Sequence, residues 1–225
     1  ILIIGGFITK ILGMVIKIVL TRTIKTDGIG LYMMILPTFN LFITLCNLGM
    51  PTAITKLVSE HKRKSKKIVL SIIPIIIIYN ILLIILIFII SPFLSNNLLH
   101  NSNTYYPLIA TSITLPFITI SSIIKGYFFG KERVFPNTIS NIVEQLARLI
   151  LTIFLVSKMM KYGLVIAVTS VVLINVISEF SSIVVLLLFL PKEKIDKEDF
   201  KVDNSILREM LGISLPTTMA RLIGS

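Results

Sequence analysis

The sequence predicts an all-α integral membrane protein, and three observations lead to that class. The 225 residues are 55% hydrophobic and only 15% charged, whereas a soluble domain has about 25% charged residues. The mean hydropathy is +0.94. The apolar residues also form long blocks, such as the uncharged run 68–93. Because about 20 apolar residues are enough to cross the hydrocarbon core of a bilayer, such a block predicts a membrane span.

Six apolar segments predict a six-helix transmembrane bundle, and a seventh helix begins near Ile206. Helices are expected because a helix satisfies its backbone hydrogen bonds within one segment, whereas a barrel would show short strands of alternating polarity. The six segments are 1–20, 29–50, 69–92, 104–125, 136–157 and 163–190. The chain starts at Ile1 and ends inside an apolar pattern, so we expect it to be a fragment of a longer protein.

Lysine and arginine residues are distributed unequally between the two sides of this predicted bundle. Loops 51–68, 125–135 and 191–205 contain 13 of them, whereas the loops on the opposite side contain 4. Loops rich in Lys and Arg stay in the cytoplasm, so we expect the N-terminus to be cytoplasmic and the protein to lie in the plasma membrane. The net charge of +11 is then explained by orientation signals, and a nucleic-acid partner is not expected.

Residues typical of soluble enzymes are sparse. His61 and His100 fall in predicted loops on opposite sides of the membrane, and Cys46 lies within an apolar segment. No Cys/His metal spacing, phosphate-binding loop or nucleophile motif is present. We therefore predict no catalytic residue, metal site or cofactor, and we interpret Cys46 as a small buried side chain.

Charged residues inside the predicted spans are the strongest functional signal. A charge at the centre of a span costs about 2.5–3.5 kcal/mol on insertion scales. In segment 136–157, Asn141, Glu144 and Arg148 share one helical face, which must meet protein or water rather than lipid. Two interpretations stay open for Glu144 and Arg148. They form a structural ion pair at i,i+4 spacing, or Arg148 lines a hydrated cavity.

Further charges extend this pattern to other spans. Lys10 and Lys17 share a face of the first segment with Gly6 and Gly13, and glycines allow another backbone or a ligand to come close. Glu179 lies in the sixth segment and Arg221 in the seventh helix. Because the bases in the spans outnumber the acids, we predict a central, hydrated cavity of net positive charge.

Three stretches resemble the MATE-like (MOP) flippase superfamily, in particular the branch of polysaccharide-biosynthesis and stage V sporulation B proteins, to which lipid II flippases are related. The resemblance runs along the whole chain. It is carried by Thr9-Lys10-Ile11-Leu12-Gly13 with Gly49-Met50-Pro51-Thr52-Ala53, by Lys125-Gly126-Tyr127-Phe128-Phe129-Gly130 with Val143-Glu144-Gln145-Leu146-Ala147-Arg148, and by Ile213-Ser214-Leu215-Pro216 with Arg221-Leu222-Ile223-Gly224-Ser225.

The resemblance implies one part of a two-lobe transporter. Residues 1–190 would form the N-terminal six-helix lobe, 191–205 a cytoplasmic inter-lobe loop, and 206–225 the start of the second lobe. Such proteins move an undecaprenyl-pyrophosphate-linked oligosaccharide or peptidoglycan precursor across the plasma membrane by alternating access. Unlike the lipid II flippases, the chain has no arginine in residues 36–50. The resemblance therefore does not decide which lipid-linked sugar is the substrate.

The site expected from these considerations contains two groups of residues. Lys10 and Lys17 match basic positions of the superfamily and are expected to bind the anionic substrate. Glu144 and Glu179 are candidates for a coupling cation or proton. The complete substrate-binding set is Lys10, Lys17, Arg148, Arg221 and Asn141.

Three alternatives remain at this point. One is a cation-coupled multidrug antiporter of the same superfamily, which would need an acidic or aromatic cavity. Another is a membrane-embedded transferase acting on lipid-linked sugars, which would need acids or histidines clustered at one membrane face. The third is a scaffold without transport activity. The sequence also leaves open the identity of the sugar, the coupling ion and the oligomeric state.

Overall fold

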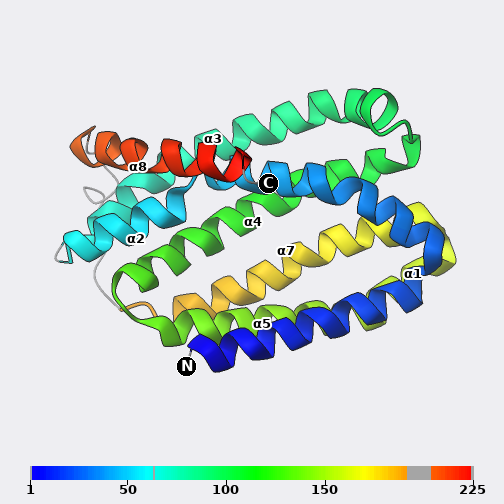
Figure 1. Ribbon diagram of the computed structural model, residues 1–225, viewed down its shortest axis with the longest axis horizontal. Helices are drawn as coiled ribbons and strands as arrows, with labels where there is room; N and C mark the ends of the chain where they lie inside the picture. Colours follow the sequence, from blue (N-terminus) through cyan, green and yellow to red (C-terminus); the bar gives the residue numbers. More distant parts are fainter. Residues whose placement is uncertain (1, 63, 192–203, 224–225) are drawn as a thin grey trace.

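The computed structural model describes residues 2–62, 64–191 and 204–223, and every regular element in that part of the chain is a helix. The longer helices lie side by side along the long axis of the molecule (Figure 1). They are α1 (Leu2–Asn47), α2 (Met50–Glu60), α3 (Ser65–Phe93), α4 (Tyr105–Gly130), α5 (Val134–Leu151), α7 (Leu164–Leu188) and α8 (Asn204–Ile223). Short helical segments complete the ends: η1 (Leu94–Leu98), η2 (Ser102–Thr104), η3 (Thr152–Val156), α6 (Ser157–Met159) and η4 (Met160–Tyr162).

Helix α1 reverses direction at Lys25, whose backbone is not helical (φ 56°, ψ −172°). Its two halves, which we call arm 1 (residues 2–24) and arm 2 (residues 26–47), run in opposite directions (Figure 1). They correspond to the predicted spans 1–20 and 29–50. Within the described residues, five helices rather than six are therefore long and apolar enough to cross a membrane, because one element supplies the first two predicted spans.

The predicted seventh helix is present as α8, which begins at Asn204. It is not one of the five helices that meet the length and hydropathy requirement for a membrane span. The predicted inter-lobe loop 191–205 falls mostly on residues 192–203, which lie outside the described residues.

The predicted loop 51–68 is largely helical, so this expectation was wrong. Arm 2 ends at a corner where Leu48 and Gly49 both have positive φ (43° and 62°), and α2 continues from there to Glu60. The many lysines of this segment suggested a loop, but only Lys56 lies on α2, where it is exposed on the outer side, and the others lie in the turn after α2 and at the start of α3. The inner side packs into the core through apolar residues at helical spacing: Ala53, Ile54, Leu57 and Val58.

Helices α2 and α4 approach each other backbone to backbone. A Cβ atom added at Gly130 would lie 2.6 Å from Val58 Cβ and 2.8 Å from the Thr55 carbonyl oxygen. One added at Gly126 would lie 2.8 Å from the Pro51 carbonyl oxygen. Small residues permit such close packing of helices within a membrane. The backbones of α2 and α4 are therefore in close contact along this face, with α3 and α8 packed on α2.

A buried polar cluster joins arm 2, α3 and α4. The Cys46 thiol lies 2.7 Å from Asn80 Oδ1 and 2.8 Å from Thr119 Oγ1, and Thr119 Oγ1 lies 3.3 Å from Asn80 Oδ1. Cys46 is 1% exposed, as predicted, but it is hydrogen-bonded rather than surrounded by apolar groups alone. In a membrane, such contacts between side chains tie neighbouring helices together.

One side of α3 carries a continuous set of exposed apolar side chains, which are Ile77, Ile78, Ile81, Leu82 and Ile85. A stable protein does not expose such a large apolar face to water. With its high mean hydropathy, this face of α3 therefore contacts lipid, and the core lies on its other side.

The turns that follow α2 and α4 meet at one end of the bundle. Lys62 Nζ lies 2.8 Å from Glu132 Oε1, and Lys131 Nζ donates a hydrogen bond of 2.7 Å to the Lys62 carbonyl oxygen. The hydrogen bond and positive charge of Lys62 hold the pKa of the exposed Glu132 carboxyl below its usual value. Two loops that the charge pattern assigns to the same side of the membrane are therefore in contact.

The conformation of Lys25 generates a prediction about stability. Its φ and ψ values lie in a region that residues other than glycine adopt at a cost of about 1–3 kcal/mol, and its side chain is exposed. Lys25→Gly should therefore raise the thermal unfolding temperature of the detergent-solubilised protein, and Lys25→Val should lower it. The control is Thr26→Gly in the following helical arm, which should be destabilising. Equal destabilisation by both glycine substitutions would contradict the assigned turn.

Candidate functional site

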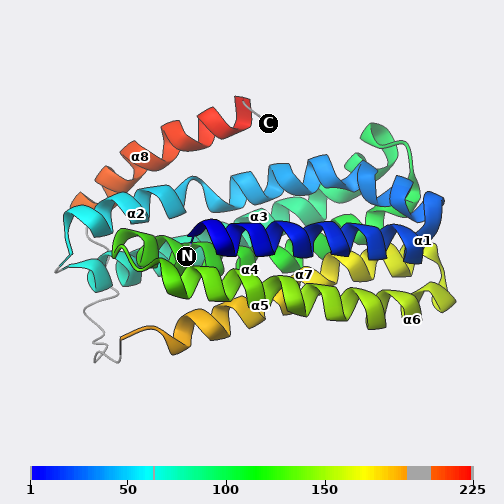
Figure 2. The ribbon, with the colours of Figure 1, turned by 60° about the horizontal axis from the view of Figure 1, so that its bottom comes forward.

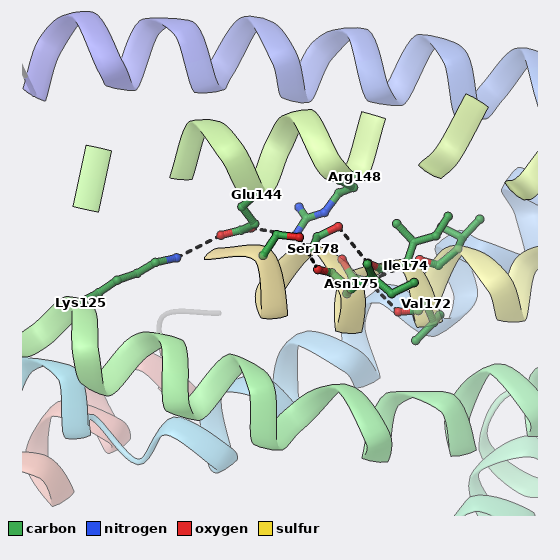
Figure 3. A network of polar contacts seen from close by, with 10 residues as sticks. Lys125, Glu144, Arg148, Val172, Ile174, Asn175 and Ser178 are labelled. Carbon is green, nitrogen blue, oxygen red and sulfur yellow. Dashed lines mark hydrogen bonds and ion pairs between the residues drawn. The ribbon is translucent and has the colours of Figure 1, made fainter. Parts of the chain in front are cut away.

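Helices α4, α5 and α7 bring four charged residues together inside the bundle. Lys125 comes from α4, Glu144 and Arg148 from α5, and Glu179 from α7. Glu144 Oε2 lies 3.0 Å from Lys125 Nζ, and Glu144 Oε1 lies 2.8 Å from Arg148 Nη2 (Figure 3). The carboxylate side chain is 10% exposed and its two partners are 20% and 25% exposed. One carboxylate thus bridges two cations from different helices.

The sequence of α5 accounts for this placement. Asn137, Ser140 and Glu144 recur at intervals of three and four residues and are buried on one side of the helix. The opposite side exposes Leu146 and Ile150. The polar side therefore faces protein, and Asn141 lies half-buried beside it. Beyond Arg148 the helix continues into the wider turns of η3, where Thr152 Oγ1 donates to the Arg148 carbonyl oxygen at 2.7 Å.

Several buried polar atoms around this cluster have no hydrogen-bond partner among the described residues. Glu179 Oε2 is one of them and Ser182 Oγ of α7 is another, while the Ser121 hydroxyl of α4 lies close enough to the Glu179 carboxyl for a hydrogen bond. Glu144, Lys125 and Arg148 are all close enough to act on Glu179 electrostatically. Leaving a buried polar atom unpaired costs about 1–3 kcal/mol. A carboxylate with hydroxyl oxygens nearby is the donor set that a proton or a small hard cation would satisfy.

Arg148 also has an unpaired group within this cluster. Its Nη2 is bound to Glu144, but its Nε is buried and has no partner among the described residues. The Nε–H group of Arg148 therefore remains able to donate a hydrogen bond. The i,i+4 pair expected from the sequence is present, and it is extended by Lys125 rather than closed on itself.

Lys10 and Lys17 lie elsewhere, on the exposed side of arm 1. Neither side chain makes a hydrogen bond or an ion pair with any residue that the structure describes, and both residues are exposed. Nothing lies within 4 Å of a Cβ atom built at Gly6 or Gly13 on the same side. The four residues share one face as predicted, but that face is open. The assignment of both lysines to substrate binding stays a prediction.

Arg221 is also exposed, near the end of α8. Its Nη2 donates a long hydrogen bond of 3.4 Å to Thr52 Oγ1 of α2. The predicted substrate-binding residues thus fall into three places: Lys10 and Lys17 on arm 1, Arg148 and Asn141 on α5, and Arg221 beside α2.

Lys125 was missed as a site residue because the predicted span ended there and the residue was assigned to a loop. Helix α4 in fact continues to Gly130, so Lys125 points along the same side as Ser121 and Ser122, one turn earlier. That spacing was a usable signal. The contact with Glu144 was not, because it joins residues from two helices.

The bridge generates a prediction about stability. Glu144→Gln would remove the carboxylate that is bound directly to both Lys125 and Arg148 and leave Glu179 as the remaining acid of the cluster, and removing one partner of a buried ion pair costs about 3–5 kcal/mol. Arg148→Gln and Lys125→Gln each leave Glu144 one cation, so each should destabilise less. Thermal unfolding of the purified protein in detergent measures the difference, with Lys17→Gln as an exposed control that should have almost no effect. Equal losses for Glu144→Gln and Arg148→Gln would mean that Lys125 contributes nothing to the cluster.

The whole chain, residues 1–225, matches the family model described as polysaccharide biosynthesis protein. Among curated proteins it is similar to stage V sporulation protein B of Bacillus subtilis, with 33% identity over 100% of this chain and 46% of that protein. It is also similar to the lipid II flippase MurJ of the same organism, with 27% identity over 86% of this chain and 39% of that protein. The chain spans about half the length of these relatives.

The fold is similar to that of solved transporters. A MATE protein in its straight conformation superposes with a TM-score of 0.66 and 16% identity, over 97% of this chain and 50% of that one. A MOP superfamily transporter from Pyrococcus furiosus gives a TM-score of 0.65 with the same identity and coverage. These similarities confirm the fold class and the resemblance to the MATE-like flippase superfamily that the sequence motifs indicated.

Proposed function

The chain belongs to the polysaccharide biosynthesis protein family, and on that basis we propose that it is part of a flippase for an anionic, lipid-linked sugar precursor. The observation that supports this most directly is the open face of arm 1. Lys10 and Lys17 are exposed there among exposed apolar residues of a membrane helix. Charges at membrane depth face a hydrated cavity or another protein surface rather than lipid, and a row of cations suits an anionic ligand.

The physical task of such a cavity is to replace water around a pyrophosphate group. Lysine and arginine can donate charge-assisted hydrogen bonds to phosphate oxygens, and arginine can donate two in parallel. Lys10 and Lys17 supply point charges on arm 1. Arg148 lies at a separate place, partly buried on α5, and its unpaired Nε makes it a second candidate donor. No bond in the substrate is made or broken, so the proposal is transport rather than catalysis.

We propose that residues 1–190 form the N-terminal lobe and that 206–225 begin a second lobe, with 191–205 connecting them on the cytoplasmic side. Alternating access would arise from rocking of the two lobes about a site near the middle of the membrane. Glu144 and Glu179 would take up the coupling cation or proton, because Glu179 Oε2 and the Ser182 hydroxyl on the same helix have no hydrogen-bond partner among the described residues. The undecaprenyl-pyrophosphate carrier is part of the same proposal.

A multidrug antiporter of the same superfamily needs acids or aromatic rings to hold an organic cation. The open face of arm 1 presents lysines instead, which favours an anionic substrate. A transferase would need acids or histidines at one membrane face, and such a cluster of three or more is absent from the described residues. The antiporter remains the alternative that a transport assay must distinguish.

Transport should depend on the positive charges. Lys10→Gln and Arg148→Gln should each reduce flipping about tenfold or more, because a hydrogen bond to a charged group contributes about 1.5–3 kcal/mol. Lys10→Arg should retain more activity than Lys10→Gln. The assay is complementation of a flippase-deficient strain by the complete gene, with protein abundance in the membrane measured in parallel. Lys158→Gln, which changes an exposed lysine of α6 just beyond η3, is the matched control.

Full complementation by the double variant Lys10→Gln/Arg148→Gln would overturn the cationic-cavity mechanism. Export of organic cations that survives in this variant would favour the antiporter instead. The membership of the family does not depend on either result.

The orientation of the bundle is a separate proposal with its own test. Cysteines introduced at Ser59 and Ser102, both exposed, should react differently with a membrane-impermeant thiol reagent in intact cells. Position 102 should be labelled and position 59 should not, because the lysine-rich loops stay in the cytoplasm. Cys46→Ser provides the background, since serine preserves the hydrogen bonds to Asn80 and Thr119. The opposite pattern of labelling would invert the topology.

A further inference from the structure

A second cationic site lies between α2, α4 and α8, away from the open face of arm 1. It is a cavity of about 570 Å³, within the range of volumes of sites for small ligands. Six of its lining residues carry the argument that follows: Asn47, Thr52, Ser122, Lys125, Gly126 and Arg221. Figure 2 shows α8 lying alongside α2 at this place.

Two glycines shape this cavity. Gly49 has a φ of +62° and forms the corner between arm 2 and α2, and a Cβ atom there would lie 2.7 Å from the Ser214 carbonyl oxygen of α8. Gly126 brings α4 equally close to Pro51. Because both approaches are made by backbone, the side chains of Thr52, Lys125 and Arg221 are left around the space between the helices.

The charge of the cavity is positive. Lys125 and Arg221 both line it, and its lining contains no carboxylate. Arg221 is held only by the 3.4 Å hydrogen bond to Thr52 Oγ1, so within the described residues its guanidinium has no acidic partner. Lys125 is bound to Glu144 on the side facing α5, and its ammonium group can donate two further hydrogen bonds.

The uncharged groups of the cavity further restrict the class of ligand that it can bind. Thr52 and Ser122 present hydroxyls, which donate to anionic oxygens or accept from hydroxyl groups. Asn47 is 8% exposed, and its buried Oδ1 has no hydrogen-bond partner among the described residues. A phosphate oxygen does not donate to that atom, whereas a sugar hydroxyl or an amide N–H does. The donor and acceptor set therefore fits a phosphate with a hydroxylated or amide-bearing group beside it.

We propose that the cavity lined by Lys125 and Arg221 binds the sugar-linked phosphate of the precursor's headgroup, as a site separate from the lysines of arm 1. The choice of a lipid-linked ligand rests on the proposed function. The binding of a sugar-linked diphosphate does not rest on the proposed function, because it follows from the charges and hydrogen-bonding groups of the cavity. Lys125 would be shared between the ligand and Glu144, and so would connect this cavity to the cluster on α5.

The test is a binding measurement on the complete protein in lipid nanodiscs. The probe is a short-chain prenyl diphosphate carrying N-acetylglucosamine, titrated by calorimetry into wild type and variants. Arg221→Gln is the primary variant because Arg221 is exposed and makes only one long contact, so folding should be preserved. We expect its Kd to rise about tenfold, with partial recovery in Arg221→Lys. The matched control is Arg208→Gln, an exposed arginine on the same helix that does not line the cavity.

Two further titrations identify the part of the probe that is recognised. Inorganic pyrophosphate should bind more weakly than the probe but with the same dependence on Arg221, and Asn47→Leu should weaken binding of the probe while leaving pyrophosphate unaffected. Unchanged affinity in Arg221→Gln, or an equal loss in Arg208→Gln, would overturn the proposal. Arg221-dependent binding without transport would refute the flippase function and leave this site standing. Transport with binding that does not depend on Arg221 would refute this site and leave the flippase function standing.

Discussion

The Glu144 carboxylate is the contact on which the interior of this bundle depends, because its two oxygens neutralise cations from two different helices. Inside a membrane protein an unpaired ammonium or guanidinium group is expensive. Lys125 can remain in α4 and Arg148 in α5 because the carboxylate between them is bound to both, and Glu179 supplies a second acid that acts on the same two cations. The positions of α4 and α5 relative to each other therefore follow from electrostatics as much as from apolar packing.

This arrangement also divides the polar interior into two compartments. On one side of Glu144, Lys125 borders the cavity that Arg221 shares with α2 and α8. On the other side, Glu144, Lys125 and Arg148 all act on Glu179, whose Oε2 has no hydrogen-bond partner among the described residues. An anion that binds Lys125 would compete with Glu144 for it, and the carboxylate would then depend on Arg148 alone. The two compartments are thus physically connected through one side chain.

The class of protein and most of its spans could be predicted from hydropathy, because an apolar run of about 20 residues or more is rarely stable outside a membrane. The polar side of α5 was also predictable, since its residues repeat with the period of a helix. Helix α2 was not predicted, although Ala53, Ile54, Leu57 and Val58 carry that same period. The lysines of segment 51–68 suggested a loop, but only Lys56 of them lies on α2, where it is exposed on the outer side. The hydrogen bond from Arg221 to Thr52 joins residues 169 positions apart, and no local pattern in a single sequence encodes such a contact.

The bridge at Glu144 has a consequence for biogenesis. Helix α4 leaves the ribosome carrying Lys125, and the acid that compensates it follows 19 residues later in α5. Until α5 arrives, α4 alone would place an uncompensated ammonium group near the bilayer. The tight connection between the two helices, residues 131–133, lets them partition into the membrane as one hairpin with its acid already beside its lysine. The unit of co-translational insertion at this point of the chain is therefore expected to be the helical pair.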